Sequence, residues 1–388
     1  MKKSLIALAV LAASGAAMAQ SSVTLYGIVD TYLSSEKTET AAENGGANTS
    51  LTQNKLSSGG VNTSRWGLKG TEDLGGGLKA NFDLQQGFDT DTGAAKTVNA
   101  FDASGNPIDA KGNNILDANG KYVLTSSGIR SKQAQTPAAF ARQAWVGISG
   151  GFGAVRLGKT STPYYDIDSL QAAMFDAFFA PQRKVFASSY NGYTNFTGNT
   201  IYYQAPNISG FSGAVSYSLN ENKAATFEAG YVTSLNLTYA GGPISASFGF
   251  QNEKVTDNAQ AVTFVRLGGA YDFGVAVAKA TYGRVSDGRY AGGVITPLAG
   301  NETTEWQVGV DVPISSALIL SASFAKSDEN TFAGGNNATG RTGGGAAAKY
   351  ILSKRTFAYV GIEADKATDP AKNDATNTTI AAGIQHRF

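Results

Sequence analysis

The dominant pattern along the chain is a stretch in which apolar and polar positions alternate, followed by a turn and another such stretch. In the run LKANFDLQQ, residues 78–86, apolar side chains fall on one face and polar side chains on the other. The same split recurs around Val265 and around Trp306. Alternation with a period of two predicts β-strands in a sheet that has an apolar environment on one side and water on the other.

The connections between these stretches come in two lengths that take turns along the chain. Tight turns of Gly, Asn, Asp or Pro type, such as Asp73 to Gly77 and Pro313 to Ser316, alternate with long polar segments. The long segments are Ser35 to Ser58, Asp89 to Ala138, Ser161 to Asn195, Ser286 to Asn301, Asp328 to Gly343 and Ala367 to Thr376. Short connections on one rim and long ones on the other are typical of a transmembrane β-barrel.

The alternating stretches predict sixteen strands, an even number. Many have about 10 to 12 residues, which fits a tilted span of a bilayer, whereas strands of soluble proteins average about 5 or 6. We therefore predict an all-β fold, a 16-stranded antiparallel transmembrane β-barrel, in preference to a soluble β-sandwich. The predicted strands are residues 23–34, 61–72, 78–88, 139–149, 154–160, 198–205, 211–219, 227–239, 243–253, 261–272, 275–285, 303–313, 317–327, 344–353, 356–366 and 377–388.

The first residues have the features of a secretory signal peptide. Lys2 and Lys3 form a basic start, Leu5 to Ala13 an apolar core, and Ala17-Met18-Ala19 a small-x-small cleavage site. The apolar core is too short for a membrane-spanning helix of about 20 residues. We therefore expect a cleaved signal peptide over residues 1–19, followed by a single barrel domain over residues 20–388.

Composition excludes several classes of function. Gly accounts for 47 of 388 residues, Cys is absent, and the one histidine is His386, close to the end of the chain. Thiol chemistry is therefore excluded, and a histidine-based metal site or Ser-His-Asp system would have to form on a chain terminus. Without Lys2 and Lys3 the 31 basic residues become 29 against 30 acidic ones, a balance that does not indicate a nucleic-acid partner. We therefore expect that the protein is not an enzyme and that it binds no cofactor.

One match to a nucleotide-binding motif is best explained as a chance match. Residues 153–160 match G-x-x-x-x-G-K-[ST], the phosphate-binding P-loop. Val155 and Leu157 alternate with Arg156 as in a strand, Pro163 follows, and no α/β repeat surrounds the segment. A P-loop needs a strand before it and a helix after it, so we assign residues 154–160 to a barrel strand.

Four segments carry a resemblance to a known family. They are SSVTLYGIVD (residues 21–30), SRWGLKGTEDLGGGLKA (64–80), RQAWVGISGGFGAVRLGK (142–159) and the terminal Phe388. Together they resemble the general porins of Gram-negative bacteria of the Neisseria and Burkholderia type. The resemblance implies a homotrimeric barrel in the outer membrane, in contact with membrane lipid and lipopolysaccharide, with the third long loop folded into the lumen. It also implies that Phe388 is the signal read by the barrel-assembly machinery.

The third long loop differs from the others in composition. Residues 163–196 contain Asp166, Asp168 and Asp176 together with nine Phe and Tyr residues. A loop surrounded by water would not carry so many aromatic side chains, so we expect it to pack on the inner wall and constrict the pore. The run SLQAAMFDAFF, residues 169–179, is expected to form one or two helical turns.

Strand parity predicts a basic wall opposite this loop. Because Trp66 and Leu157 face outward, Arg65 and Arg156 should face the lumen. The direction of Arg142 is ambiguous, and Lys159 lies where a strand becomes a loop. The resemblance to porins implies that Arg65, Arg142 and Arg156 together form the basic wall of the constriction. The candidate site adds Lys159 on the basic side and the loop acids Asp166, Asp168 and Asp176 on the other. Opposed charges across a narrow passage set ion preference, and we expect a mild preference for anions.

General diffusion of small ions and hydrophilic solutes is the function that these features favour. A substrate-specific channel of the same architecture would show saturable block by one solute. A surface adhesin or structural barrel anchor with an occluded lumen would show no conductance. The segment Asp89 to Ala138 could contact a neighbouring subunit, cover the pore or be disordered, and the sequence leaves these alternatives open.

The signal-peptide assignment predicts that the mature protein begins at Gln20. Mass spectrometry of protein purified from outer membranes should give the mass of residues 20–388. A mass that includes Lys2 and Lys3 would contradict the assignment.

Overall fold

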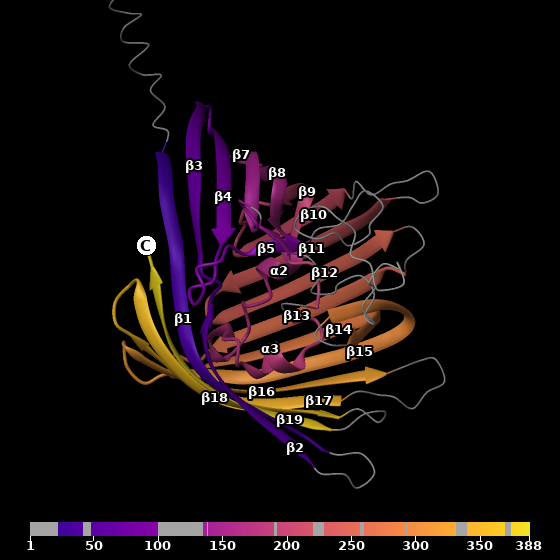
Figure 1. Cartoon of the computed structure of the whole chain (residues 1–388). Coiled ribbons are helices and arrows are strands. Elements are labelled where there is room, and N and C mark those ends of the chain that lie inside the picture. The colour runs from indigo at the N-terminus through magenta and orange to yellow at the C-terminus, as the bar shows by residue number, and fades with distance from the viewer. Residues whose placement is uncertain are drawn as a thin grey trace, which may run out of the picture.

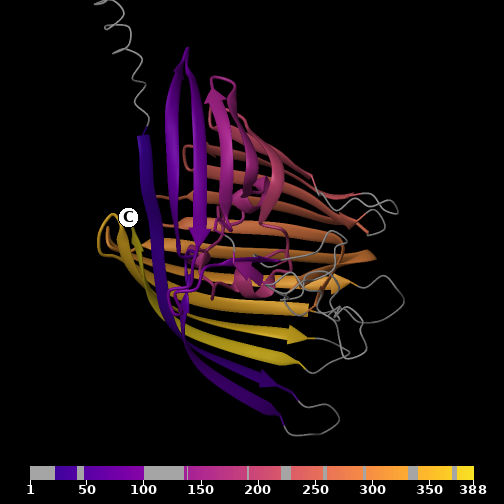
Figure 2. The same ribbon diagram turned by 45° about the horizontal axis from the view of Figure 1, so that its top comes forward.

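A computed structural model describes residues 22–41, 48–99, 135–137, 139–189, 192–219, 229–256, 260–291, 294–330, 340–368 and 374–388. The expected signal peptide, residues 1–19, lies outside the described residues, as does most of the segment Asp89 to Ala138. The described chain forms a curved sheet that wraps around an interior segment (Figures 1 and 2).

The strands run antiparallel to their neighbours in the main sheet. A separate small pair consists of β5 (Thr97–Asn99) and β6 (Gln135–Pro137). The strands of the main sheet are β1 (Ser22–Thr40), β2 (Thr49–Ser58), β3 (Arg65–Gly75), β4 (Leu78–Gly87), β7 (Gln143–Gly150), β8 (Gly153–Ser161), β9 (Phe196–Gln204), β10 (Phe211–Leu219), β11 (Ala229–Gly241), β12 (Ile244–Thr256), β13 (Val262–Asp272), β14 (Val277–Ala291), β15 (Val294–Pro313), β16 (Leu318–Asn330), β17 (Gly340–Ile351), β18 (Thr356–Thr368) and β19 (Ala375–Arg387).

The sheet closes because its first and last strands pair with each other. Strands β1 and β19 are antiparallel, from Ile28 opposite Arg387 to Thr40 opposite Ala375. Both β2 and β3 pair with β1, so they are two halves of one interrupted wall strand. Counted this way, the wall has sixteen strands, which confirms the predicted 16-stranded antiparallel barrel. A closed barrel satisfies the backbone hydrogen bonds that lipid cannot satisfy.

The interruption between β2 and β3 is held by one buried carboxylate. Asp30 accepts hydrogen bonds from the backbone N–H groups of residues 60–62 at 2.9–3.0 Å. The hydroxyl of Tyr359 donates to the same carboxylate at 2.6 Å. The sequence predicted an unbroken strand over residues 61–72, which is wrong, because the first residues of that stretch bend inward to bind Asp30.

Several segments expected to be long loops are extensions of the strands. Strands β14 and β15 continue to Ala291 and from Val294, so the expected loop Ser286 to Asn301 is a protruding hairpin. The segments Ser35 to Ser58, Asp328 to Gly343 and Ala367 to Thr376 likewise contain strand at both ends. Water surrounds both faces of a strand beyond the membrane, so the alternation that predicted strands disappears while the hydrogen-bonded ladder continues.

Side chains are distributed as in a barrel surrounded by lipid. Large apolar residues such as Val146, Leu157 and Leu237 expose 51–61% of their surface on the outer face. Polar residues of the inner face, such as Glu305 and Gln307, are buried. Among the described residues no helix is long and apolar enough to cross a membrane.

The third long loop lies inside the barrel, as predicted (Figures 1 and 2). It contains three short helices: α2 (Pro163–Asp166), the 3₁₀ turn η2 (Met174–Asp176) and α3 (Pro181–Val185). Helix α2 contacts β10 to β12, and α3 contacts β15 to β18. Helical turns were expected within residues 169–179, but only η2 lies there. Both α-helices begin with a proline, whose fixed φ favours the first helical position.

The last residue completes the closure of the barrel, which gives a prediction for assembly. Gly27 and Phe388 exchange two backbone hydrogen bonds of 3.1 Å, and the Phe388 ring covers the position where a Gly27 side chain would start. Deleting Phe388 should lower the yield of folded barrel severalfold in cells, because the sequence predicts that this terminal aromatic residue is the assembly signal. Gel electrophoresis without heating measures the yield. Conductance of the barrels that do form should be unchanged, and normal yield would contradict the prediction.

Candidate functional site: the inward loop and the wall it faces

The loop enters the lumen through a capped helix that is bonded to the wall. The side chain of Thr162 accepts a hydrogen bond from the Tyr165 N–H at 3.3 Å and so caps α2. Ser234 of β11 accepts from the Tyr164 N–H at 2.9 Å, and Asn236 donates to the Pro163 carbonyl at 2.7 Å. The start of the loop is therefore fixed against β11.

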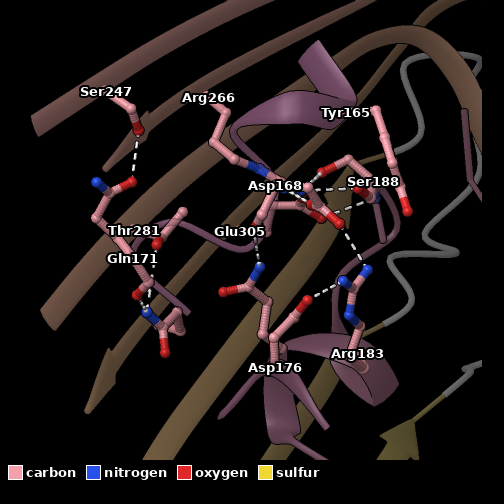
Figure 3. A network of polar contacts seen from close by, with 12 residues as sticks. Tyr165, Asp168, Gln171, Asp176, Arg183, Ser188, Ser247, Arg266, Thr281 and Glu305 are labelled. Atoms are coloured by element: carbon pink, nitrogen blue, oxygen red, sulfur yellow. Dashed lines mark hydrogen bonds and ion pairs between the residues drawn. The ribbon is translucent and has the colours of Figure 1, made fainter. Parts of the chain in front are cut away.

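The centre of the loop is held by a buried network of two acids and two arginines (Figure 3). Asp168 pairs with Arg183 of α3 at 2.5 Å and also with Arg266, which projects from β13. Arg183 forms a second ion pair with Asp176. Arg266 and Asp168 are only 1% and 3% exposed. The charges of Asp168 and Asp176 are therefore compensated within this network.

Wall carboxylates act as acceptors for the backbone of the loop's second half. Glu305 of β15 accepts hydrogen bonds from the N–H groups of Ala187 at 2.8 Å and Ser188 at 3.3 Å, and from the Ser188 hydroxyl. Arg266 donates to the Ser188 carbonyl at 2.7 Å. Near the end of the loop, Glu253 accepts from the Thr194 N–H at 2.5 Å. Charge-assisted hydrogen bonds are stronger than neutral ones, so these acids hold the loop firmly.

Neutral polar residues of the wall bind the middle of the loop. Gln307 donates to the Gln171 carbonyl at 2.8 Å, while Ser247 donates to the Gln171 side chain at 2.5 Å (Figure 3). Ser321 accepts from the Met174 N–H at 2.8 Å. Strands β11 to β16 therefore each supply at least one side chain that binds the loop.

Aromatic side chains of the loop pack on the inner wall in two places. Tyr164 and Tyr193 lie edge to face at 4.8 Å and pack near Phe264 of β13. Phe178 stacks on Tyr32 of β1 with ring centroids 4.1 Å apart. The many aromatic residues in the loop therefore serve mainly to anchor it across the lumen.

The wall formed by β8 and β9 carries one fixed arginine. The guanidinium of Arg156 lies 4.9 Å from the Trp145 ring centroid and 4.8 Å from that of Tyr202. The Tyr202 hydroxyl donates to Asp166 of the loop at 2.8 Å. Burial raises the pKa of Asp166, although hydrogen bonds from Ser161 and Tyr202 partly offset this effect. Of the three predicted loop acids, Asp166 is the one placed against this wall.

Strands β3 and β4 extend the charged wall. Lys69 lies 5.1 Å from the Tyr26 ring centroid, and the Tyr26 hydroxyl donates to Asp83 at 2.5 Å. A cavity of about 350 Å³ lies against this surface, and Lys69, Asp83 and Arg156 are among the residues that line it. Arg65 is on the same strand as Lys69, with its Nη1 donating to the Thr63 carbonyl at 3.1 Å. Asp83 was not among the predicted site residues, although alternation placed it on the polar face of its strand.

Two of the predicted basic residues, Arg142 and Lys159, are not among the residues that line this cavity. Arg142 is 7% exposed, donates to Gln85 at 2.7 Å and lies 4.5 Å from the Phe196 ring centroid, where the loop rejoins the wall. Lys159 of β8 lies opposite Ala144, beside a bulge in the pairing of β8 with β9. The loop-holding residues Arg266, Glu253 and Glu305 were missed as site residues. The alternation of apolar and polar positions could have identified all three, because each falls on the polar face of its strand.

Comparison with known proteins identifies the class to which this barrel belongs. A family model for Gram-negative porins matches residues 5–370. The chain is 32% identical over 350 residues to outer membrane porin protein 32 of Delftia acidovorans, covering 85% of this chain and 81% of the relative. It is 30% identical to an outer membrane porin protein of Bordetella pertussis, with both chains covered completely. The chain therefore belongs to the Gram-negative porin family.

A solved structure agrees with this assignment. The anion-selective porin from Comamonas acidovorans superimposes with a TM-score of 0.67 at 25% sequence identity, covering 95% of this chain and all of that one. Family and fold together establish an outer-membrane porin, a member of a class of channels and not of enzymes.

The buried network predicts that Asp168 controls how firmly the loop is held. In Asp168→Asn, Arg183 loses one partner and Arg266 loses its carboxylate, and breaking a buried ion pair typically costs about 3–5 kcal/mol. We expect a lower thermal unfolding temperature of the barrel, together with higher and noisier single-channel conductance. Asp328→Asn is the matched control, because its pair with Lys326 is exposed at 40–45%. Unchanged stability and conductance in Asp168→Asn would contradict this role.

Proposed function

We propose that this porin passes small hydrophilic solutes and ions by diffusion, with a mild preference for anions. The proposed path runs between the inward loop and the wall of β3, β4, β7, β8 and β9. Arg65, Lys69 and Arg156 form its basic side, and Asp83 and Asp166 supply the acidic groups. No covalent step is involved, because solutes move down their own gradients through water.

The observation that carries the proposal is the separation of the loop acids. Asp168 and Asp176 bind Arg183 and Arg266 within the loop anchor, so their charges are compensated. Of the three loop acids, only Asp166 reaches the wall of Arg156, through Tyr202. Three basic residues along the path therefore outnumber two acidic ones. The anion-selective Comamonas porin, which shares this fold, supports the same sign.

Arg156 is suited to act on passing ions because aromatic rings fix its position, and among the described residues no ion pair neutralises it. The rings of Trp145 and Tyr202 hold the guanidinium by cation–π contacts, which leave its charge intact. In confined water the effective dielectric is below that of bulk water, so one side chain changes the ion barrier by up to about 1 kcal/mol. A fixed charge of this kind biases selectivity without binding ions tightly.

The working unit that we propose is a homotrimer in the outer membrane, in contact with membrane lipid and lipopolysaccharide. The apolar outer face and the polar inner face support contact with lipid on one side and with ions and solutes on the other. The site residues are assigned to passage and selectivity, and none is assigned to catalysis.

Replacing Arg65 and Arg156 together with Ala should move the zero-current potential in a salt gradient toward cation selectivity. The shift should be largest at low salt, because screening shortens the reach of charge at high ionic strength. Planar-bilayer recording of purified trimers measures it. Lys37→Ala with Arg284→Ala is the control, since it removes the same charge from exposed ion pairs. A double mutant that matches the parent at low salt would show that the basic wall lies elsewhere.

A further inference from the structure

The turn η2 has an unusual backbone. Met174, Phe175 and Asp176 have φ values of 53°, 61° and 57°, so three successive residues with side chains lie in the left-handed region. Such residues rarely adopt this conformation, and strain of this kind persists where surrounding contacts impose it. Here Ser321 accepts from the Met174 N–H at 2.8 Å, and Asp176 pairs with Arg183.

The strained turn separates the side chains of two apolar neighbours. Met174 is completely buried between the loop and the wall, whereas Phe175 is only half-buried. The Phe175 ring instead faces Lys349 of β17, whose ammonium lies 4.5 Å from the ring centroid. Phe357 of β18 flanks the same ammonium at 5.5 Å. The turn therefore places the Phe175 ring beside the Lys349 ammonium, which also contacts the Phe357 ring.

The charge of Lys349 contrasts with that of the neighbouring lysine on the wall. Lys279 of β14 pairs with Asp311 at 2.6 Å and donates to the Ala172 carbonyl at 3.0 Å, so its charge is compensated. Within the described ranges, Lys349 has no carboxylate within ion-pair distance and contacts the two rings instead. Lys349 can therefore still bind an anion.

Phe175, Lys349 and Phe357 lie on the side of the inward loop that faces the rim with the tight turns. This side is called the short-turn side below. Lys349 is two residues from the end of β17, and Phe357 is the second residue of β18, across the tight turn between them. In the strand order of the barrel, β17 and β18 stand across from β8, which carries Arg156. The group is thus separate from the basic wall assigned to ion preference.

We propose that Phe175, Lys349 and Phe357 form a weak binding site for aromatic carboxylates, reached from the short-turn side of the lumen. The ammonium would bind the carboxylate, and the two Phe rings would pack edge to face with the ring of the solute. A small anion such as acetate would gain the charge interaction alone. The site rests on the proposed function, because solutes must be able to enter the lumen.

Benzoate and acetate are the probes that test the site. Purified trimers in planar bilayers are first characterised in potassium chloride alone, and each probe is then added to the short-turn side. We expect benzoate to reduce the chloride current in a saturable manner at concentrations where acetate has little effect.

Phe175→Gly removes the ring and should fold well, because glycine adopts a φ of 61° without strain. It should weaken the block by benzoate by about five- to tenfold, as expected for the loss of one good contact. Lys349→Met should weaken it at least as much. Lys326→Met is the control for charge, because Lys326 is exposed and paired with Asp328. This control should respond to benzoate as the parent does.

The outcomes separate this site from the proposed function. A parent protein without ion conductance would overturn both. A conducting, anion-preferring parent that responds equally to benzoate and acetate would overturn the site alone, as would full block by benzoate in Phe175→Gly.

Discussion

Closure of the sheet is the constraint on which the rest of this structure depends. The pairing of β1 with β19 leaves the wall without an open edge, so backbone groups at the depth of the membrane bond to each other instead of to water. Closure also separates two environments. Lipid contacts the outer face and water the inner face, and every strand must alternate its side chains accordingly.

A polar interior allows the inward loop to be attached in a way that an apolar core would not. Asp168, Arg183 and Arg266 form a buried network at the centre of the attachment, and Glu305 binds the adjacent backbone. Asp168 and Asp176 are ion-paired within this attachment, and we propose that they therefore contribute little to ion selectivity. Asp166, which reaches Tyr202 instead, is the loop acid that contributes to the wall of Arg156. Mechanical attachment and ion preference are therefore assigned to different carboxylates of the same loop.

The strained turn η2 shows a second consequence of this attachment. Binding of Met174 to Ser321 and of Asp176 to Arg183 fixes both ends of the turn, and Phe175 between them is directed toward Lys349. The same contacts that hold the loop therefore decide which side chains the lumen presents on the short-turn side.

The alternation of side chains determined the fold class, the number of wall strands and the inward direction of the strand residue Arg156, because lipid and water impose a pattern with a period of two. The aromatic content of residues 163–196 determined that this loop packs inside. Strand ends beyond the membrane were not predictable, since both faces are wet there. Tertiary structure alone decided that Asp168 and Asp176 pair with Arg183 and Arg266, and that residues 60–62 bend to Asp30. Asp168 with Arg266 and Asp30 with residues 60–62 join segments far apart in the chain, and even for the nearer pair of Asp176 with Arg183 no local pattern records which acid meets which base.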